Sequence, residues 1–299
     1  METEANRQSY REGKQRLRSV RWMLFWIAAV QTAVAMVVAV VASFFSVPPP
    51  FWVQMLLVEL FAYLLPLSFY ARENRLLSAK TARERFGLKR CRNDLWIYVI
   101  LGGIGCQFVM LVLNLPINLL LSQGESVVPR NLTELLAALV VVAVIPAVFE
   151  EFLFRGIVYG VMKEFNTRAA MIFTTLLFAL MHGSITGFLG YLFLGWAAVE
   201  ILRRTGSMYA CMGFHLANNV TAVLLSRYSG ELLYYPMGTL WLFLGGILAA
   251  VLGFLGIRNM TTPAPKTNLM RCSDLLGQSF SSLPVLLCIL CLAGVWILG

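Results

Sequence analysis

Residues 135–155 read LLAALVVVAVIPAVFEEFLFR, an apolar stretch that ends in two glutamates and an arginine. A helix needs about 20 mostly apolar residues to cross a bilayer, so this stretch is long enough to do so. Asn131, followed three residues later by Glu134, is a capping pair of the kind that opens helices. The sequence therefore predicts a membrane-spanning helix over 135–160 that carries ionisable side chains inside it.

The composition of the whole chain is that of a membrane protein. Of 299 residues, 59% are hydrophobic and 13% are charged, and the mean hydropathy is +0.75, whereas soluble domains average about 25% charged residues. An all-α, polytopic transmembrane helix bundle is predicted, with nine candidate spans near 22–45, 51–70, 95–121, 135–160, 168–184, 186–202, 207–226, 238–257 and 281–298. A short turn separates the fifth from the sixth, so a re-entrant pair and eight spans are the alternative.

Basic residues predict the orientation. The chain has 24 Lys and Arg against 15 Asp and Glu, a net charge of +9, and 21 of these basic residues precede the first span or occupy alternate loops. Basic loops beside membrane spans remain in the cytoplasm. We therefore expect a cytoplasmic N-terminus, a lipid bilayer rather than nucleic acid as the partner, and, from the compact loops, a bacterial plasma membrane.

The two glutamates and the arginine in the fourth predicted span divide into two roles. Glu151 and Arg155 are four residues apart with the acid first, which is the favourable order for an ion pair on a helix. Glu150 projects about 100° away around the helix. Glu150 is then free to take and give protons. The structural alternative is that all three side chains only join helices.

Both histidines of the chain, His182 and His215, fall in apolar segments. Phe178 precedes His182 by four residues and Asn219 follows His215 by four, so each pair shares one helix face. A single membrane histidine is more often a contact between helices than a catalytic group. A carboxylate, two imidazoles and an amide on three helices can together hold a water, activate it and stabilise an oxyanion.

This inventory fits two designs. In one, Glu150 is the base, His182 helps to hold the water, and His215 and Asn219 donate to the oxyanion. In the other, Glu150, His182 and His215 are the three protein ligands of a catalytic zinc ion that keeps one open position. The sequence is compatible with both, so the predicted cofactor is either none or zinc.

Three motifs follow one another on successive predicted segments: EExxxR at 150–155, FxxxH at 178–182 and HxxxN at 215–219. In this order they resemble the CPBP family of intramembrane proteases, which includes CAAX prenyl proteases, bacteriocin-processing enzymes and the Ras-converting CAAX endopeptidase. The similar region runs from about Leu132 to Arg227. The resemblance implies that Glu150 is the base of a peptidase, with a site completed by His182, His215 and Asn219 and supported by Glu151, Arg155 and Phe178. Members of the family are described both as metalloproteases and as metal-free glutamate enzymes.

The motifs divide the chain into three predicted parts. Residues 1–130 hold a basic N-terminal segment and the first three spans, residues 131–227 form the catalytic core, and residues 228–299 hold the C-terminal spans. Two other classes of intramembrane protease are disfavoured. The chain has no HExxH motif, and its only aspartates, Asp94 and Asp274, fall in predicted loops.

The predicted function is hydrolysis of a peptide bond in a membrane-associated substrate, either prenylated and CAAX-type or similar to a bacteriocin or signal peptide. The alternative is a non-enzymatic protein, either an immunity-type binder or a transporter that uses the same polar cavity. A transporter is expected to show repeated halves, and none is visible. Glu59, in the second span, is expected to pair with Arg155 or, alternatively, to line the substrate cavity.

Overall fold

The computed structural model describes residues 2–44, 50–74, 86–121 and 128–298, and within these ranges it contains helices and no strand. The all-α prediction is confirmed. The helical elements are α1 Glu2–Ser43, α2 Phe51–Glu73, η1 Asn93–Leu95, α4 Trp96–Leu120, α5 Leu132–Ala138, η2 Leu139–Val144, α6 Ile145–Glu150, η3 Glu151–Tyr159, α7 Gly160–Met162, α8 Thr167–Met181, α9 Phe188–Thr205, α10 Met208–Arg227, α11 Ser229–Tyr234, α12 Pro236–Met260, α13 Cys272–Phe280 and α14 Leu283–Leu298.

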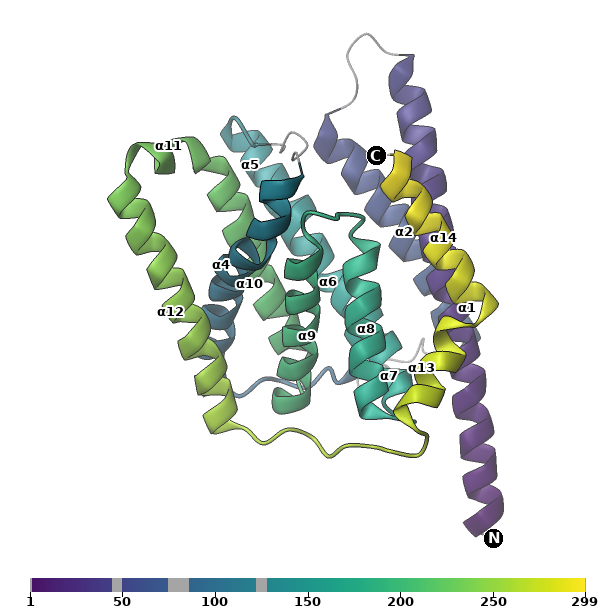
Figure 1. Ribbon diagram of the computed structural model, residues 1–299. Coiled ribbons are helices and arrows are strands. Elements are labelled where there is room, and N and C mark those ends of the chain that lie inside the picture. Colours follow the sequence, from purple (N-terminus) through teal and green to yellow (C-terminus); the bar gives the residue numbers. More distant parts are fainter. Residues whose placement is uncertain (1, 45–49, 75–85, 122–127, 299) are drawn as a thin grey trace.

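The helices form three groups that lie side by side (Figure 1). On one side α1 packs against α2 and α14, and on the other side α4 packs against α10 and α12. The middle group contains α6, η3, α8 and α9. The middle group therefore has a wall of helices on either side.

Each of the nine predicted spans coincides with a helix or a run of helices. Within the described residues, six helices are long and apolar enough to cross a membrane, and α13 with α14, bent by 62°, would make a seventh. The segments predicted at 168–184 and 186–202 fall on α8, a shorter apolar helix, and on α9, which is outside that set. The polytopic helical bundle is confirmed, while the count of eight or nine spans stays a prediction.

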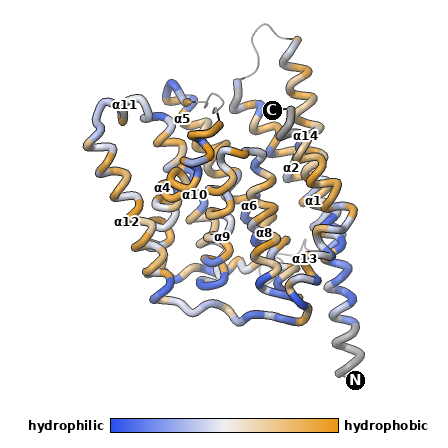
Figure 2. Tube along the Cα trace, viewed as in Figure 1, coloured by the Kyte–Doolittle hydropathy of each residue, from blue (hydrophilic) through white to orange (hydrophobic). Residues whose placement is uncertain are grey.

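Loops predicted to share one side of the membrane gather at one end of the bundle. Figure 2 shows hydrophilic residues at the N-terminal end of α1 and along the connection from α12 to α13. Three contacts join these segments to the ends of neighbouring helices: Ala264 N donates to Arg203 O (2.8 Å), Thr167 N donates to Thr267 O (3.0 Å), and Arg16 pairs with Glu164 (2.6 Å). The arrangement agrees with the predicted alternation of loops, and the membrane side that this end faces stays a prediction.

The fourth predicted span is one run of helical elements, from α5 to α7, that passes through the centre of the bundle. It begins at Asn131, whose Oδ1 accepts a hydrogen bond from Glu134 N at 2.9 Å, so the predicted cap is confirmed. Two parts of the run, η2 and η3, have the wider π-helical turn. Such turns are frequent at functional sites because they shift side chains from their α-helical positions.

Small residues allow α4 and α12 to approach closely. A Cβ added at Gly105 would overlap the backbone of Ala250, and one added at Gly253 would overlap the backbone of Gly102. In a bilayer, helix association depends on this close packing because lipid chains are as apolar as the side chains. The pairing of α4 with α12 therefore depends on these positions.

We expect Gly105→Val to lower the stability of the protein by about 1–3 kcal/mol, because the added methyl groups force the two helices apart. Thermal unfolding of the detergent-solubilised protein measures the effect. Gly245→Val is the matched control, since no atom lies within 4 Å of a Cβ added at Gly245 on α12. Equal losses of stability in the two variants would contradict the close packing of α4 and α12.

Candidate active site

A buried arginine lies at the centre of the motif residues. Arg155 in η3 is 1% exposed, and its Nη1 lies 3.0 Å from Oε1 of Glu151, so the ion pair predicted from the spacing is present. Its Nη2 donates to the carbonyl of Gly195 on α9 at 3.2 Å. Burial of an unpaired charge is costly, and these contacts compensate the charge of Arg155.

Glu151 has a second partner on α10. Nδ1 of His215 lies 2.7 Å from the same Oε1 that contacts Arg155. Because an ionised carboxylate only accepts hydrogen bonds, Nδ1 carries the proton in this contact. His215 is 1% exposed, and it also borders the cavity that contains Glu150. The sequence spacing predicted the pair of Glu151 with Arg155 but gave no sign of the contact with His215.

Phe178 on α8 packs against the other motif residues. The guanidinium carbon of Arg155 lies 4.4 Å from the centre of its ring, a cation–π contact. The ring of His182 is 4.6 Å away and that of His215 is 5.9 Å away, measured between centroids. The phenylalanine of the FxxxH motif thus packs against Arg155 of the buried ion pair and against both imidazoles.

His182 follows directly after the last residue of α8 and faces Glu150. Its Nδ1 lies 2.7 Å from the carbonyl oxygen of Phe178, so Nδ1 carries a proton and, in the neutral ring, Nε2 has a free lone pair. Nε2 lies 3.7 Å from Oε2 of Glu150. Tyr191 stacks on the imidazole with a centroid separation of 3.8 Å. The hydrogen bond to the carbonyl of Phe178 and the stacking of Tyr191 set the orientation in which Nε2 points toward Glu150.

Glu150 is free of the ion pair next to it. It is 8% exposed, its Oε2 has no hydrogen-bond partner among the described residues, and Arg155 contacts Glu151 instead. Tyr63 on α2 donates to Oε1 of Glu150 over a long 3.4 Å. Glu151 is therefore the glutamate that pairs with Arg155, and the role of Glu150 in proton transfer stays a prediction.

Asn219 on α10 contacts a backbone carbonyl of η2, near a proline. Its Nδ2 donates to the oxygen of Val142 at 3.1 Å. Pro146 follows Val142 by four residues and has no N–H to offer. Asn218 donates to Oδ1 of Asn219 at 3.0 Å. Nδ2 of Asn219 has a second N–H, which remains available for a ligand.

These side chains surround a cavity of about 260 Å³, which we call the polar chamber. Residues from α2, α4, η2, α6, α9, α10 and the connection between α8 and α9 line it, and the polar ones are Glu59, Gln107, Asn114, Glu150, His182, Tyr191, His215, Asn218 and Asn219. All four predicted catalytic side chains border this one space. Side chains from separate parts of the predicted core thus converge on one cavity.

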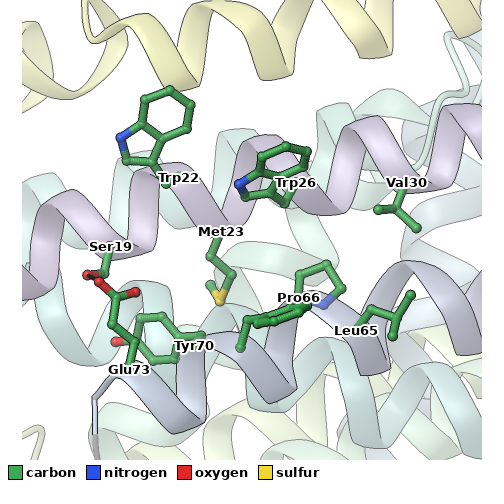
Figure 3. Close-up of a pocket in the computed structure, with 10 residues that line it drawn as sticks. Ser19, Trp22, Met23, Trp26, Val30, Leu65, Pro66, Tyr70 and Glu73 are labelled. Atoms are coloured by element: carbon green, nitrogen blue, oxygen red, sulfur yellow. Dashed lines mark hydrogen bonds between the residues drawn. The ribbon is translucent and has the colours of Figure 1, made fainter.

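A larger cavity lies elsewhere among the described residues. It has a volume of about 470 Å³ and lies between α1 and α2, lined by apolar side chains that include Trp22, Trp26 and Pro66 (Figure 3). Its polar feature is a hydrogen bond from Ser19 to Glu73. No imidazole or paired carboxylate borders it, so its size does not make it the site of the chemistry.

The expected pairing of Glu59 with Arg155 is wrong. Arg155 is held by Glu151, by the carbonyl of Gly195 and by the ring of Phe178, and no ion pair of Glu59 occurs among the described residues. Glu59 lines the polar chamber instead, in agreement with the alternative reading. Spacing along one helix finds partners four residues away, whereas Glu59 lies on a different helix.

Several residues at the site were not predicted from the sequence: Gln107, Asn114, Tyr191 and Asn218 line the polar chamber, and Tyr63 contacts Glu150. Gln107, Asn114 and Asn218 are polar side chains inside predicted spans, and that signal is visible in the sequence. Tyr63 and Tyr191 give no such signal because aromatic residues are common throughout membrane helices.

The proposed zinc ligands do not form a metal site as they are placed here. Across the described residues, no group of three or more His, Cys, Asp or Glu side chains is positioned to hold a metal ion, and Glu150, His182 and His215 are all described. Nδ1 of each histidine contacts a protein oxygen, which leaves Nε2 as the nitrogen that would face a ligand. The positions of these side chains, not their chemistry, do not match a zinc site; zinc binding stays a prediction, and we derive no step through a metal.

Comparison with protein families finds one match. Residues 132–221 match the family model described as type II CAAX prenyl endopeptidase Rce1-like. The match begins at the residue where the sequence resemblance begins and lies within the predicted core, 131–227. Neither the comparison with curated proteins nor that with solved structures found a significant match.

Removal of Glu151 tests the buried cluster. We expect Glu151→Leu to destabilise the protein by about 3–5 kcal/mol, because Arg155 would keep a buried and poorly compensated charge. The double variant Glu151→Leu/Arg155→Met removes both charges and is expected to recover most of the loss. Thermal unfolding is the measurement, with Glu231→Gln as the control, since Glu231 is 60% exposed in its pair with Arg227. A double variant less stable than the single one would contradict the assignment.

Proposed function

We propose that this chain, in which residues 132–221 match the family model described as type II CAAX prenyl endopeptidase Rce1-like, is an intramembrane endopeptidase in which Glu150 activates water for peptide hydrolysis. The observation that carries the proposal is the pairing of an uncompensated Glu150 with Nε2 of His182, 3.7 Å from its Oε2, at the wall of the polar chamber. The substrate is a membrane-associated peptide or protein, and the protein acts in a bacterial plasma membrane.

The proposed first step is deprotonation of a water molecule. Glu150 and the Nε2 lone pair of His182 are both acceptors, and their 3.7 Å separation allows one water to donate a hydrogen bond to each. This arrangement orients an oxygen lone pair toward the substrate carbonyl. Glu150 takes one proton as the oxygen attacks the carbonyl carbon.

The attack places negative charge on the former carbonyl oxygen. The second N–H of Asn219 and Nε2–H of His215 are the proposed donors to this oxyanion. For Nε2 of His215 to donate, the ring must carry both protons, and Glu151 at 2.7 Å from Nδ1 supplies the counter-charge. Glu150 then returns its proton to the leaving nitrogen as the C–N bond breaks, so the proton balance closes.

The proposal needs no metal, and its chemistry comes from side chains that border the polar chamber. A binding protein or a transporter would not require a carboxylate and an imidazole to face one another in this way. The proposed substrate is either a prenylated CAAX-type peptide or one similar to a bacteriocin or signal peptide.

Substitution of the base is the first test. We expect Glu150→Gln and His182→Ala each to lower kcat/KM for a cleaved membrane peptide by about 10²–10⁴-fold. Asn219→Ala is expected to cost about 10²–10³-fold, because one oxyanion donor is lost. Products are measured by mass spectrometry on purified protein in liposomes, with Glu231→Gln as the control. Unchanged cleavage by Glu150→Gln would exclude Glu150 as the base.

Metal removal is the second test. We expect dialysis against a strong chelator to leave kcat/KM within about twofold of the untreated protein, because the proposed steps use protein groups only. Elemental analysis of the same active sample is expected to show no stoichiometric zinc. Loss of activity that returns when zinc is added back would refute the metal-free mechanism.

A further inference from the structure

A second carboxylate approaches the polar chamber from outside the matched segment. Glu59 on α2 is 8% exposed, and its Oε2 has no hydrogen-bond partner among the described residues. It lies one helical turn before Tyr63, which contacts Glu150, and residues four apart share a helix face. Glu59 therefore faces the same region as the side chain proposed as the base.

Glu59 lies where two spaces meet. One is the polar chamber, and the other is a cavity of about 420 Å³ between α1, α2 and the core, which we call the α1–α2 cavity. Met55, Glu59, Glu150 and His182 line both of them. A peptide chain cleaved between Glu150 and His182 would thus continue past Glu59 into the α1–α2 cavity.

The charged groups at this junction are acidic. Glu59 and Glu150 are both carboxyl groups, and no Lys or Arg is among the described residues that line the two spaces. Arg155, beneath the chamber, is already engaged by Glu151 and the carbonyl of Gly195. An acidic side chain at membrane depth requires a partner or a cavity that serves a ligand, and no described side chain is that partner.

We propose that Glu59 is a specificity-determining residue that binds a cationic group of the substrate beside the scissile bond. This inference rests on the endopeptidase function proposed above. An ammonium or guanidinium group fits because it would form a charge-assisted hydrogen bond with the unpartnered oxygen. The group comes from a lysine or arginine side chain or from a free amino terminus. A substrate carboxylate at the same place is repelled by both glutamates.

Paired peptides test this directly. A positional-scanning library of N-acetylated fluorogenic peptides, carrying lysine or uncharged norleucine at each position around the scissile bond, is assayed with the full chain in liposomes. At one position we expect lysine to raise kcat/KM by about tenfold or more over norleucine, the effect of one charge-assisted hydrogen bond. Glu59→Gln is expected to remove that ratio, and Glu59→Asp to retain part of it.

Glu73→Gln is the matched control. Glu73 lies on the same helix but borders the apolar cavity near Trp22 instead of the two spaces that meet at Glu59, so its variant is expected to keep the lysine preference. Norleucine peptides with free amino termini, compared with their acetylated forms, distinguish an amino terminus from a side chain as the source of the cation. A lysine preference that is the same in wild type and Glu59→Gln overturns the proposal. The proposal is also overturned if the wild type prefers neither lysine nor a free amino terminus.

A binding measurement separates this inference from the catalytic proposal. In the Glu150→Gln background, the library peptides are titrated and the Kd of lysine and norleucine forms is compared. A lysine form that binds about tenfold tighter, with the difference lost in Glu59→Gln/Glu150→Gln, supports the cation subsite even if the wild type cleaves nothing. Cleavage by wild type combined with equal Kd values, or no measurable binding of any lysine peptide, refutes the subsite.

Discussion

The packing of the core helices depends on the contacts that the guanidinium group of Arg155 makes. This group is buried in η3, paired with Glu151 one turn earlier, bonded to the carbonyl of Gly195 on α9 and placed over the ring of Phe178 on α8. Through Glu151 the same cluster reaches His215 on α10. A charge in a region of low dielectric constant is tolerated only with such compensation, so the relative positions of these helices are tightly constrained.

This cluster also determines which glutamate is available for chemistry. Glu151 is occupied by Arg155 and His215, whereas Glu150, its neighbour in the chain, faces the polar chamber and His182. Phe178 connects the buried ion pair with the proposed catalytic residues. Its ring contacts Arg155, and its carbonyl oxygen accepts a hydrogen bond from Nδ1 of His182. The structural group Glu151 and the proposed base Glu150 therefore occupy adjacent positions in the chain, and Phe178 contacts both Arg155 and His182.

The N-terminal helices contribute to the site even though the family match starts at residue 132. Tyr63 contacts Glu150, and Glu59 borders both spaces that meet at Glu150. The matched segment supplies the residues common to the motifs, and α2 closes one side of the chamber. Differences in substrate preference between proteins with this core are then expected to arise in helices such as α2 that pack around it.

The amino-acid sequence alone was enough to predict the helical membrane architecture, the capped start of the fourth span at Asn131 and the pairing of Glu151 with Arg155. These features are local or repeat with the helical period, so spacing along the chain reveals them. The tertiary structure alone decided that His215 binds Glu151, that Glu59 faces the chamber instead of Arg155, and that Tyr63 and Asn218 join the site. Each of these depends on which helices become neighbours and how they are rotated, and no spacing within a single helix specifies that.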